Sequence, residues 1–279
     1  MEKSQSTPKK ERIDKLLVDK GLVESREKAQ ALIMTGVVFV NNQKVDKPGT
    51  KIPTDANIYI KEKMPYVSRG GFKLEKGIKV FNLDVKDKVC LDIGSSTGGF
   101  TDCLLQNGAK KVYAVDVGKN QLHEKLKSDP RVVSIEGFNA RYLSKKEIPE
   151  EIDILVADVS FISLTKILPN ICDILKEDFK GIILLKPQFE LSKKEVKDGV
   201  VKDPVLHEKA IKSVIDSLYE SCYCVKDLDF SPIKGPEGNI EFLIYIERKN
   251  QDCKPVNYEK IKQVVSQAHN TLWYNFLKP

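Results

Sequence analysis

The feature that most constrains the fold is an alternation, from residue 86 onward, of apolar runs of strand length with helical stretches. The runs are KVCLDIGSS, KKVYAVDVG, VVSIEG, DILVADVSF and KGIILLKPQF, and helices are expected over residues 99–107, 119–128 and 163–176. Because continuous apolar strands need cover on both faces, this pattern predicts a mostly parallel, doubly wound α/β sheet. Two later runs, ESCYCVKDLDFSP and NIEFLIYIER, predict a terminal antiparallel pair.

The first sixty residues follow a different pattern, that of a small α+β module. Apolar residues at helical spacing predict a first helix. Ser25 is a favourable N-cap for a second helix over residues 26–34, which stops at Gly36. The run VVFVNNQKV predicts a hairpin that turns at Asn41 and Asn42, and ANIYI supplies a last strand.

A length of 279 residues suits one small and one medium domain. The expected parts are a disordered lead (1–10), the small module (11–60), a linker (61–67), the α/β domain (68–250) and a tail (251–279) with a short helix around 257–274. The net charge is +6, and residues 1–63 hold 13 Lys and Arg against 9 Asp and Glu. This basic excess favours an anionic partner for the small module.

Several classes of protein are disfavoured. The segment MEKSQSTPKKERID is polar and charged, so no secretory signal peptide is expected. No run approaches the roughly 20 apolar residues of a membrane span, so we expect a cytoplasmic protein that does not enter membranes. The six cysteines form no C-x-x-C pair and the three histidines are scattered, so no metal site is expected. The cysteine pattern, including Cys222 and Cys224 in one strand-like run, favours buried or free reduced thiols.

A glycine-rich turn follows the first strand of the α/β domain. Glycines at a strand-to-helix turn let a ligand approach the backbone closely, and the helix N-terminus offers free N–H groups. The dinucleotide fingerprint is G-x-G-x-x-G. This chain has D-x-G-x-x-x-G-G instead, a form typical of methyltransferases that bind S-adenosylmethionine. The candidate cofactor-binding residues here are Asp92, Gly94, Ser95, Thr97, Gly98 and Gly99.

Asp116 ends the second strand, 22 residues after Gly94. A carboxylate at this place can accept hydrogen bonds from both ribose hydroxyls of a nucleoside cofactor. The alternative is a turn residue with no ligand. The glycine turn before it favours the cofactor role.

Four charged residues far apart in the sequence form a second candidate site: Lys73, Asp158, Lys186 and Glu241. Asp158 and Lys186 follow apolar strands, and Glu241 begins one. In open α/β sheets the ligand crevice lies beyond such strand ends. A lysine at the end of a buried strand is costly unless it is paired or functional. A structural ion-pair network is the alternative.

The small module resembles the S4 RNA-binding domain. The matching residues are Arg12, Leu16, Ser25, Arg26, Ala29, Gly36, Val38, Val40, Asn41 and Val45. In that family, basic side chains around the first two helices face RNA. The resemblance therefore implies RNA contacts from Arg12, Lys15, Arg26 and Lys28, although each lysine is also compatible with an ordinary solvated surface charge.

Six motifs stand in the same order as in the TlyA family, also called haemolysin A-like, where an S4 domain precedes an FtsJ-type methyltransferase domain. They are SRGGFKLEKGI, LDIGSSTGGFTDCLLQNGA, ADVSFISL, LLKPQFE, GVVKD and SPIKGPEGNIEFL. The chain resembles this family over residues 11–248. The resemblance implies a Rossmann-like class I methyltransferase that moves a methyl group from S-adenosylmethionine to the 2′-oxygen of cytidine in ribosomal RNA. Its partners would be ribosomal RNA or ribosomal subunits.

The same resemblance implies roles for particular residues. The family's Lys-Asp-Lys-Glu catalytic tetrad maps onto Lys73, Asp158, Lys186 and Glu241, and Asp158 also borders the cofactor. The segment GFNARYL puts Phe138 and Asn139 where the family's adenine-contacting loop lies. Lys186 is the candidate base, because the positive charge of Lys73 nearby would favour its neutral form.

Two segments and two other functions stay open. GPEGN (235–239) is either a functional loop or a turn that presents Glu241, and KKEVKDGVVKDPVLHEKA is either an RNA-facing or a solvated loop. A membrane-lytic protein, as the haemolysin name suggests, needs an amphipathic or apolar insertion segment, and none is found. A non-catalytic RNA-binding assembly factor is the other rival, and the intact tetrad argues against it.

Overall fold

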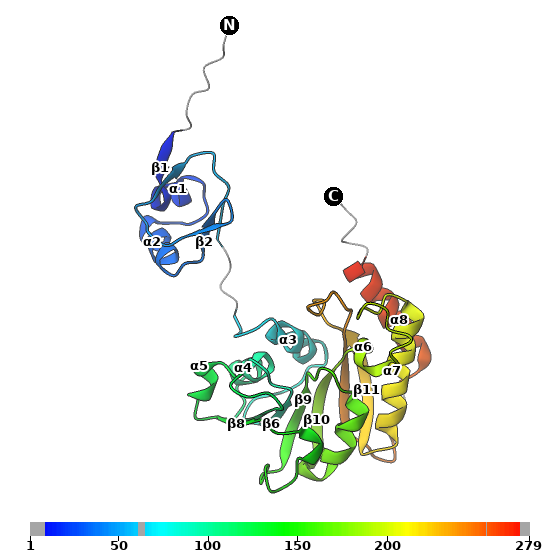
Figure 1. Ribbon diagram of the computed structural model, residues 1–279. Coiled ribbons are helices and arrows are strands. Elements are labelled where there is room, and N and C mark those ends of the chain that lie inside the picture. The colour runs from blue at the N-terminus through cyan, green and yellow to red at the C-terminus, as the bar shows by residue number, and fades with distance from the viewer. Residues whose placement is uncertain (1–8, 61–64, 255, 274–279) are drawn as a thin grey trace. The chain divides into compact units, whose positions relative to one another are not determined.

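The computed structural model describes residues 9–60, 65–254 and 256–273 (Figure 1). The chain divides into two compact units between Pro65 and Tyr66. Most of the expected lead (1–10) and linker (61–67) lies outside the described residues. Tyr66 is buried in the core of the second unit, so the end of the expected linker belongs to that unit.

The N-terminal unit combines two helices with two small sheets. Its elements are β1 (Lys10–Arg12), α1 (Ile13–Asp19), α2 (Arg26–Met34), β2 (Val38–Val40), β3 (Gln43–Val45), β4 (Lys51–Pro53) and β5 (Ile58–Ile60). One sheet consists of strands β1 and β4, and the other has the order β3-β2-β5. Ser25 Oγ accepts a hydrogen bond from Lys28 N at 3.2 Å, which confirms the predicted N-cap. Asn41 and Asn42 have φ of 48° and 66°, as a tight hairpin turn requires. The β1–β4 pair was not predicted, because the segments KER and KIP contain too few apolar residues to show an alternating pattern.

The second unit is built on a seven-stranded sheet in the order β11-β12-β10-β9-β6-β7-β8. The strands are β6 (Val89–Ile93), β7 (Lys111–Asp116), β8 (Val132–Glu136), β9 (Ile152–Ala157), β10 (Leu175–Leu185), β11 (Tyr223–Phe230) and β12 (Phe242–Arg248). Strands β8, β7, β6, β9 and β10 are parallel, whereas β12 runs antiparallel to both β10 and β11. The predicted α/β class and the terminal antiparallel pair are confirmed.

Helices cover both faces of this sheet, as Figure 1 shows. One face carries α3 (Gly70–Val80), α4 (Gly99–Gln106) and α5 (Glu124–Lys127), and the other carries η3 (Leu168–Ile174), α7 (Pro204–Tyr219) and α8 (Tyr258–Ala268). The strands alternate between the two cores: Leu91 and Ile93 face one, and Cys90 faces the other. This alternation inside continuous apolar strands produces the doubly wound architecture.

The expected helix over 119–128 shrinks to α5, and that over 163–176 becomes the 3₁₀ segments η2 (Leu164–Lys166) and η3. In the first, Glu136 accepts hydrogen bonds from the backbone N–H groups of Asn120, Gln121 and Leu122, which holds a loop. In the second, Pro169 enters the run and β10 begins at Leu175. Helices α3 and α7 were not predicted.

Four of the six cysteines form disulfides, Cys172–Cys222 and Cys224–Cys253, with Cα atoms 6.0 and 5.8 Å apart. The expectation of free thiols is wrong for these four. Their partners are 50 and 29 residues away in the sequence, so spacing along the chain carried no signal. Cys90 and Cys103 are free and buried, as expected. Within the described ranges, no helix is long and apolar enough to cross a membrane.

Candidate active site

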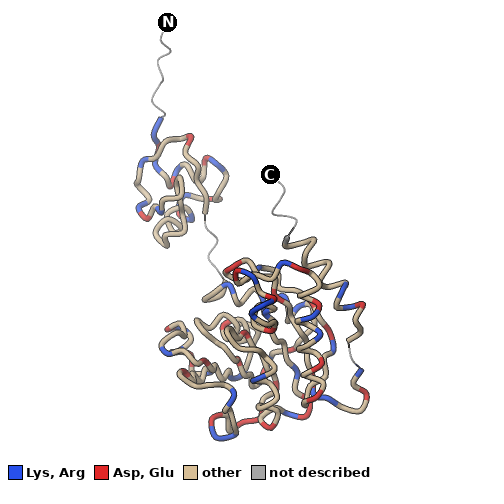
Figure 2. Tube along the Cα trace, turned by 45° about the vertical axis from the view of Figure 1, so that its right-hand side comes forward, with Lys and Arg blue, Asp and Glu red and all other residues tan. Residues whose placement is uncertain are grey.

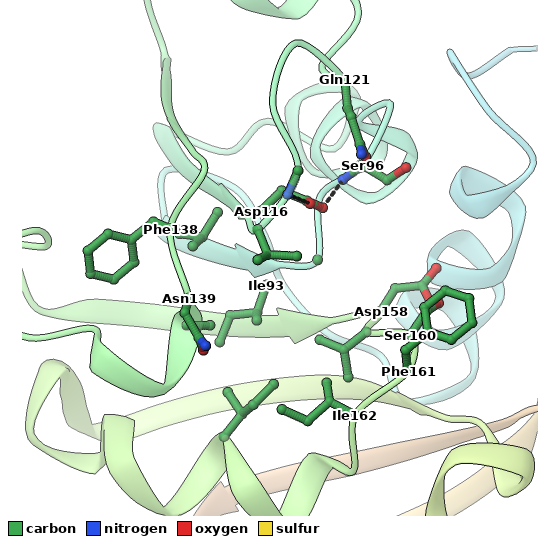
Figure 3. Close-up of a pocket in the computed structure, with 17 residues that line it drawn as sticks. Ile93, Ser96, Asp116, Gln121, Phe138, Asn139, Asp158, Ser160, Phe161 and Ile162 are labelled. Carbon is green, nitrogen blue, oxygen red and sulfur yellow. Dashed lines mark hydrogen bonds between the residues drawn. The ribbon is translucent and has the colours of Figure 1, made fainter.

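A cavity of about 570 Å³ lies beyond the ends of β6 and β9 (Figure 3). At these two neighbouring strands the order in which the chain adds strands to the sheet reverses. From β6 the chain continues to β7 on one side, and β9 leads to β10 on the other. Asp158 N donates to Ile93 O at 2.9 Å and closes the floor between the two strand ends. Ligands of open α/β sheets bind at this kind of switch point. The lining residues are Ile93, Gly94, Ser96, Val115, Asp116, Val117, Gly118, Gln121, Phe138, Asn139, Ala140, Asp158, Val159, Ser160, Phe161, Ile162 and Ile167.

Asp116 holds the loops on both sides of the cavity mouth. Its Oδ2 accepts from Ser96 N at 2.8 Å and its Oδ1 accepts from Gly118 N at 2.7 Å. Figure 3 shows the carboxylate between these two backbone segments, with Gln121 above it. Each oxygen retains a further lone pair, so the group can still accept hydrogen bonds from a ligand.

Five of the expected cofactor residues line the cavity: Gly94, Asp116, Phe138, Asn139 and Asp158. Gly94 has φ of 80°, and a Cβ there would lie 2.5 Å from Asp158 O, so the crossing of the two backbones requires glycine. The other two glycines of the motif, Gly98 and Gly99, do not line the cavity. A Cβ on Gly98 would meet Leu126, and one on Gly99 would meet Ser68, so these two permit close packing of α4.

Asp92, Ser95 and Thr97 do not line the cavity either. Asp92 is fully buried and accepts a hydrogen bond from Thr101 Oγ1 at 2.6 Å. Burial raises the pKa of Asp92 to about 7, and the Thr101 hydrogen bond opposes that rise. Asp92 therefore supports the glycine turn from beneath. Sequence reasoning missed several lining residues: Ser96, Gly118, Gln121, Ser160, Phe161 and Ile162. The only feature of the sequence that could have pointed to these residues is their position shortly after the end of a strand.

The four charged residues of the second candidate site form two buried ion pairs. Lys186 Nζ lies 2.6 Å from Asp158 Oδ1, and Lys73 Nζ lies 2.6 Å from Glu241 Oε2. Their side chains are between 1% and 19% exposed, which separates them from ordinary surface pairs. Because Asp158 also lines the cavity, the charged cluster adjoins it.

The strand register explains how the cluster forms. Ala157 pairs with Ile183 of β10, and Leu185 pairs with Phe242 of β12. Asp158, Lys186 and Glu241 each sit one residue beyond these strand ends, so they meet at one edge of the sheet. The sequence indicates where each strand ends. It does not indicate which strands are neighbours, because that depends on the order of strands in the sheet.

The electrostatics of the cluster are set by burial and pairing. Burial raises the pKa of Glu241, and the ammonium of Lys73 opposes the rise. Each lysine faces a carboxylate, and Lys186 Nζ also donates to Ser160 Oγ at 2.9 Å. Glu241 Oε1 has no hydrogen-bond partner among the described residues, which leaves an acceptor in the cluster. Each of the two lysines is thus held by one of the two carboxylates, Lys186 by Asp158 and Lys73 by Glu241.

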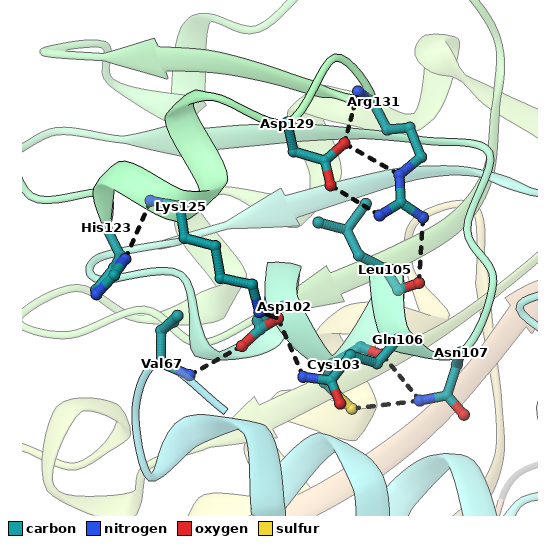
Figure 4. A network of polar contacts seen from close by, with 10 residues as sticks. All are labelled: Val67, Asp102, Cys103, Leu105, Gln106, Asn107, His123, Lys125, Asp129 and Arg131. Atoms are coloured by element: carbon teal, nitrogen blue, oxygen red, sulfur yellow. Dashed lines mark hydrogen bonds and ion pairs between the residues drawn. The ribbon is translucent and has the colours of Figure 1, made fainter. Parts of the chain in front are cut away.

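Lys73 reaches the cluster from α3, which is anchored at its start by a polar network (Figure 4). Asp102 of α4 is buried and accepts from Val67 N at 2.9 Å, Gln106 Nε2 at 3.1 Å and Lys125 Nζ at 3.1 Å. The network joins the chain that enters α3 to α4 and α5. Gly77 brings α3 against Ile182 of β10, where a Cβ would already be at 3.1 Å.

Phe161 stands at the cavity mouth with its side chain 91% exposed and φ of 64°. Its ring lies 5.1 Å from that of Phe189, centroid to centroid. A left-handed backbone is costly for a bulky residue and is kept where its surroundings or its function demand it. The exposed ring is next to Ser160, which contacts Lys186.

Comparisons with known proteins agree with this geometry. Residues 66–248 match the model of the FtsJ-like methyltransferase family, and residues 11–58 match that of the S4 domain. The Mycobacterium tuberculosis protein named 16S/23S rRNA (cytidine-2′-O)-methyltransferase TlyA is 37% identical over 260 residues, covering 92% of this chain and 96% of that protein. The chain belongs to the TlyA family. Hemolysin A of Brachyspira hyodysenteriae is 48% identical over 236 residues, covering 84% of this chain and 98% of that protein.

A solved structure supports the same membership. A Streptococcus thermophilus protein that carries the hemolysin name is 45% identical and superposes with a TM-score of 0.76, covering 98% of this chain and 100% of that one. The resemblance found in the motifs is therefore confirmed, and the chain is a methyltransferase-family protein with an N-terminal S4 domain.

In this TlyA-family chain, two of the basic residues expected to face RNA meet at a buried carboxylate. Asp14 is fully buried and accepts from Arg12 Nη2 at 2.8 Å, Arg26 Nε at 3.1 Å and Gln30 Nε2 at 3.0 Å. The Arg12 hydrogen bond, with those of Gln30 and Arg26, holds the pKa of Asp14 well below its usual range despite burial. Arg12 and Arg26 remain 42% and 51% exposed, so their outer faces are open to a ligand.

The other two residues expected to face RNA, Lys15 and Lys28, are paired with surface carboxylates. Lys15 lies 3.1 Å from Glu11, and Lys28 lies 3.2 Å from Glu24. Exposed pairs of this kind contribute little and separate easily. Figure 2 shows basic and acidic residues interspersed along both units. Exposed lysines that make no ion pair among the described residues of this unit include Lys10, Lys47 and Lys51, which sequence reasoning did not single out.

Proposed function

We propose that the chain transfers a methyl group from S-adenosylmethionine to the ribose 2′-oxygen of cytidine in ribosomal RNA. The observation that carries the proposal is the buried cluster of Lys73, Asp158, Lys186 and Glu241 beside the switch-point cavity. The M. tuberculosis relative is named for this reaction on 16S and 23S rRNA. The S4 match supports RNA, as free strands or within ribosomal subunits, as the partner.

The cavity fits the cofactor in size and chemistry. Its volume of about 570 Å³ is in the range of small-molecule sites. Asp116 would accept hydrogen bonds from the ribose hydroxyls, and Phe138, Asn139 and Ile162 would border the adenine. Asp158 lies where the cavity meets the charged cluster. When bound, S-adenosylmethionine supplies an electrophilic methyl group.

The charged residues would prepare the acceptor hydroxyl. A ribose hydroxyl is a poor nucleophile at neutral pH, so it needs placement and help in losing its proton. Lys186 Nζ would accept that proton as the hydroxyl oxygen takes up the methyl group, whose bond to the cofactor sulfur would break in the same step. Asp158 holds Lys186, and Glu241 holds Lys73, while the unpartnered Glu241 Oε1 accepts a hydrogen bond from the substrate.

An exposed aromatic at the mouth supports a nucleic acid substrate. Phe161 offers a ring face to solvent beside the cluster, and nucleobases stack on such faces with energies of about 1–3 kcal/mol each. An unpaired base held there would present its ribose to Lys186.

The test is methyl transfer from labelled S-adenosylmethionine to purified small and large ribosomal subunits, followed by mapping of ribose methylation. We expect label at the 2′-oxygen of cytidine. Lys186→Ala protein provides the control for a contaminating activity. Tight binding of rRNA without any transfer would instead support the non-catalytic assembly factor.

A further inference from the structure

The loop that follows Lys186 and precedes α7 contains a sharp turn. Lys197 and Val200 form an isolated bridge, with Val200 N donating to Lys197 O at 3.1 Å. Between them Asp198 and Gly199 have φ of 52° and 73°, the backbone of a tight turn with two left-handed residues. The backbone of this turn is preformed, so only its side chains need to be ordered on binding.

Asn239 locks this turn to the loop that carries Glu241. Asn239 is 1% exposed, and its Oδ1 accepts from Val201 N while its Nδ2 donates to Gly199 O, both at 2.9 Å. On its other side, Asn239 O accepts from Gly235 N at 2.9 Å. A Cβ on Gly235 would lie 2.6 Å from Glu241 Oε1, so this backbone packs directly on the catalytic carboxylate. The turn and Glu241 therefore form one connected unit.

The lysines on this loop differ from those singled out in the S4 unit. Lys193, Lys194, Lys197 and Lys202 are exposed, and none makes an ion pair with any residue that the structure describes. Of the acidic residues, Glu195 is paired with Lys209 and bonded to Ser192. Asp203 caps α7, and Asp198 is exposed at the tip of the turn, so the unpaired lysines outnumber the free carboxylates. The loop thus presents ammonium groups that are available to phosphates.

We propose that the segment 197–202, which we call the basic turn, binds the RNA backbone next to the target nucleotide, and that Asn239 is the positioning residue that keeps it in register with Glu241. The proposal rests on the proposed function, since it takes the substrate to be RNA. Lys197 and Lys202 contact phosphates, while the S4 unit binds elsewhere on the RNA. Of the two roles that the sequence left open for this loop, RNA-facing or merely solvated, the proposal takes the RNA-facing one.

The first test compares two double variants that remove equal charge. Lys197→Gln with Lys202→Gln changes the basic turn, and Lys110→Gln with Lys180→Gln changes two exposed lysines elsewhere, one just before β7 and one in the middle of β10. Binding of labelled 16S and 23S rRNA transcripts is measured over a salt series. We expect the basic-turn variant alone to bind roughly tenfold more weakly and to lose about 2 from the slope of log K against log salt.

The second test uses Asn239→Ala, which removes no charge. It should weaken RNA binding as the basic-turn variant does and also slow single-turnover methyl transfer. Asn239→Asp keeps the acceptor for Val201 N and should recover part of both losses. A merely structural role predicts a lower melting temperature with RNA affinity unchanged.

The outcomes separate this inference from the proposed function. If wild-type protein methylates rRNA and the basic-turn variant matches its control, the inference is wrong and the function stands. If wild-type protein never transfers methyl groups but the basic-turn variant still loses RNA affinity, the inference stands and the reaction is wrong. If Asn239→Ala does not fold, the lysine variants and Asn239→Asp decide the question.

Discussion

At the residue scale, Asp158 links the two halves of the site. Its backbone closes the floor of the cavity and its carboxylate pairs with Lys186, so one residue touches both the proposed cofactor space and the charged cluster. Removing it would disturb both functions at once. Lys186 and Asp116 each belong to one half, so substitutions there separate chemistry from cofactor binding.

We predict that Lys186→Ala abolishes methyl transfer and preserves cofactor and RNA binding. The lysine acts on the reacting hydroxyl, so its loss should appear in the chemical step. Positioned acid–base help is worth about 10²–10⁴ in rate. Single-turnover transfer and a melting curve are measured together. A folded Lys186→Ala protein with near wild-type turnover would remove the lysine from the mechanism.

Asp116→Ala should weaken binding of S-adenosylmethionine while the protein stays folded. The substitution removes the ribose acceptor and releases the backbone N–H groups of Ser96 and Gly118. Asp116→Asn is the matched variant, because it keeps one acceptor oxygen but loses the charge. Calorimetry should rank affinity as wild type, then Asn, then Ala. Equal affinity for all three would mean that the cofactor lies elsewhere.

At the element scale, strands were predicted better than helices. Buried strands are recognisable in the sequence as continuous apolar runs, so all five parallel strands and the terminal pair were predicted. The prediction of a helix over 119–128 was wrong at its start, because the carboxylate of Glu136 accepts hydrogen bonds from the first backbone N–H groups of this segment. The residue identities of the charged cluster came from strand ends and motif resemblance. Its pairing pattern required the order of β9, β10 and β12, which local sequence does not encode.

The two disulfides should stabilise the β11 edge of the sheet. Cys172–Cys222 and Cys224–Cys253 close loops of 50 and 29 residues, and the loop-entropy model assigns each about 4 kcal/mol. We expect a reductant to lower the melting temperature. Alkylation in denaturant without reductant, read by mass spectrometry, should label Cys90 and Cys103 alone. Six labelled cysteines and a melting curve insensitive to reductant would contradict the pairing.

Helices α7 and α8 meet at a buried histidine pair that predicts a pH dependence. His207 Nδ1 lies 2.9 Å from His269 Nε2, and His207 is fully buried. Burial, reinforced by the neighbouring His269, lowers the pKa of His207 to about 4, and burial also lowers that of His269. Asp203 opposes both shifts, while Lys234 adds to that of His269.

The number of protons bound in each state decides whether acid raises or lowers the free energy of unfolding. The folded state binds fewer protons than the unfolded state between the unfolded pKa of about 6.5 and the folded value, so the free energy of unfolding should decrease as pH falls through that window. Melting temperatures of wild type and His207→Gln, measured from neutral pH down to about the folded pKa, should converge as the pH falls. Buried Asp92 titrates with the opposite sign, but it is common to both proteins. Parallel pH profiles would exclude the histidine pair as the cause.

At the scale of the whole molecule, the proposed RNA contacts are shared by both units, whereas the proposed cofactor site belongs to the second unit alone. The second unit holds the whole cavity and the charged cluster. The S4 unit holds a separate core and basic residues anchored on Asp14. This division means that substrate affinity and cofactor affinity should respond independently to loss of the first unit.

We predict that deleting residues 1–63 spares binding of S-adenosylmethionine and severely weakens binding of ribosomal RNA. The deletion leaves the seven-stranded sheet and both of its cores intact, since none of their residues precedes Tyr66. It removes Arg12, Lys15, Arg26 and Lys28, whose phosphate contacts would make binding steeply salt-dependent through counterion release. Arg12→Gln with Arg26→Gln in the full chain tests the same contacts without truncation, and Asp14→Asn, which frees both guanidinium groups, is its counterpart. Calorimetry gives cofactor affinity, and a salt series with rRNA gives the slope. A truncated protein that binds rRNA as tightly as the full chain, with the same slope, would assign the S4 unit another task.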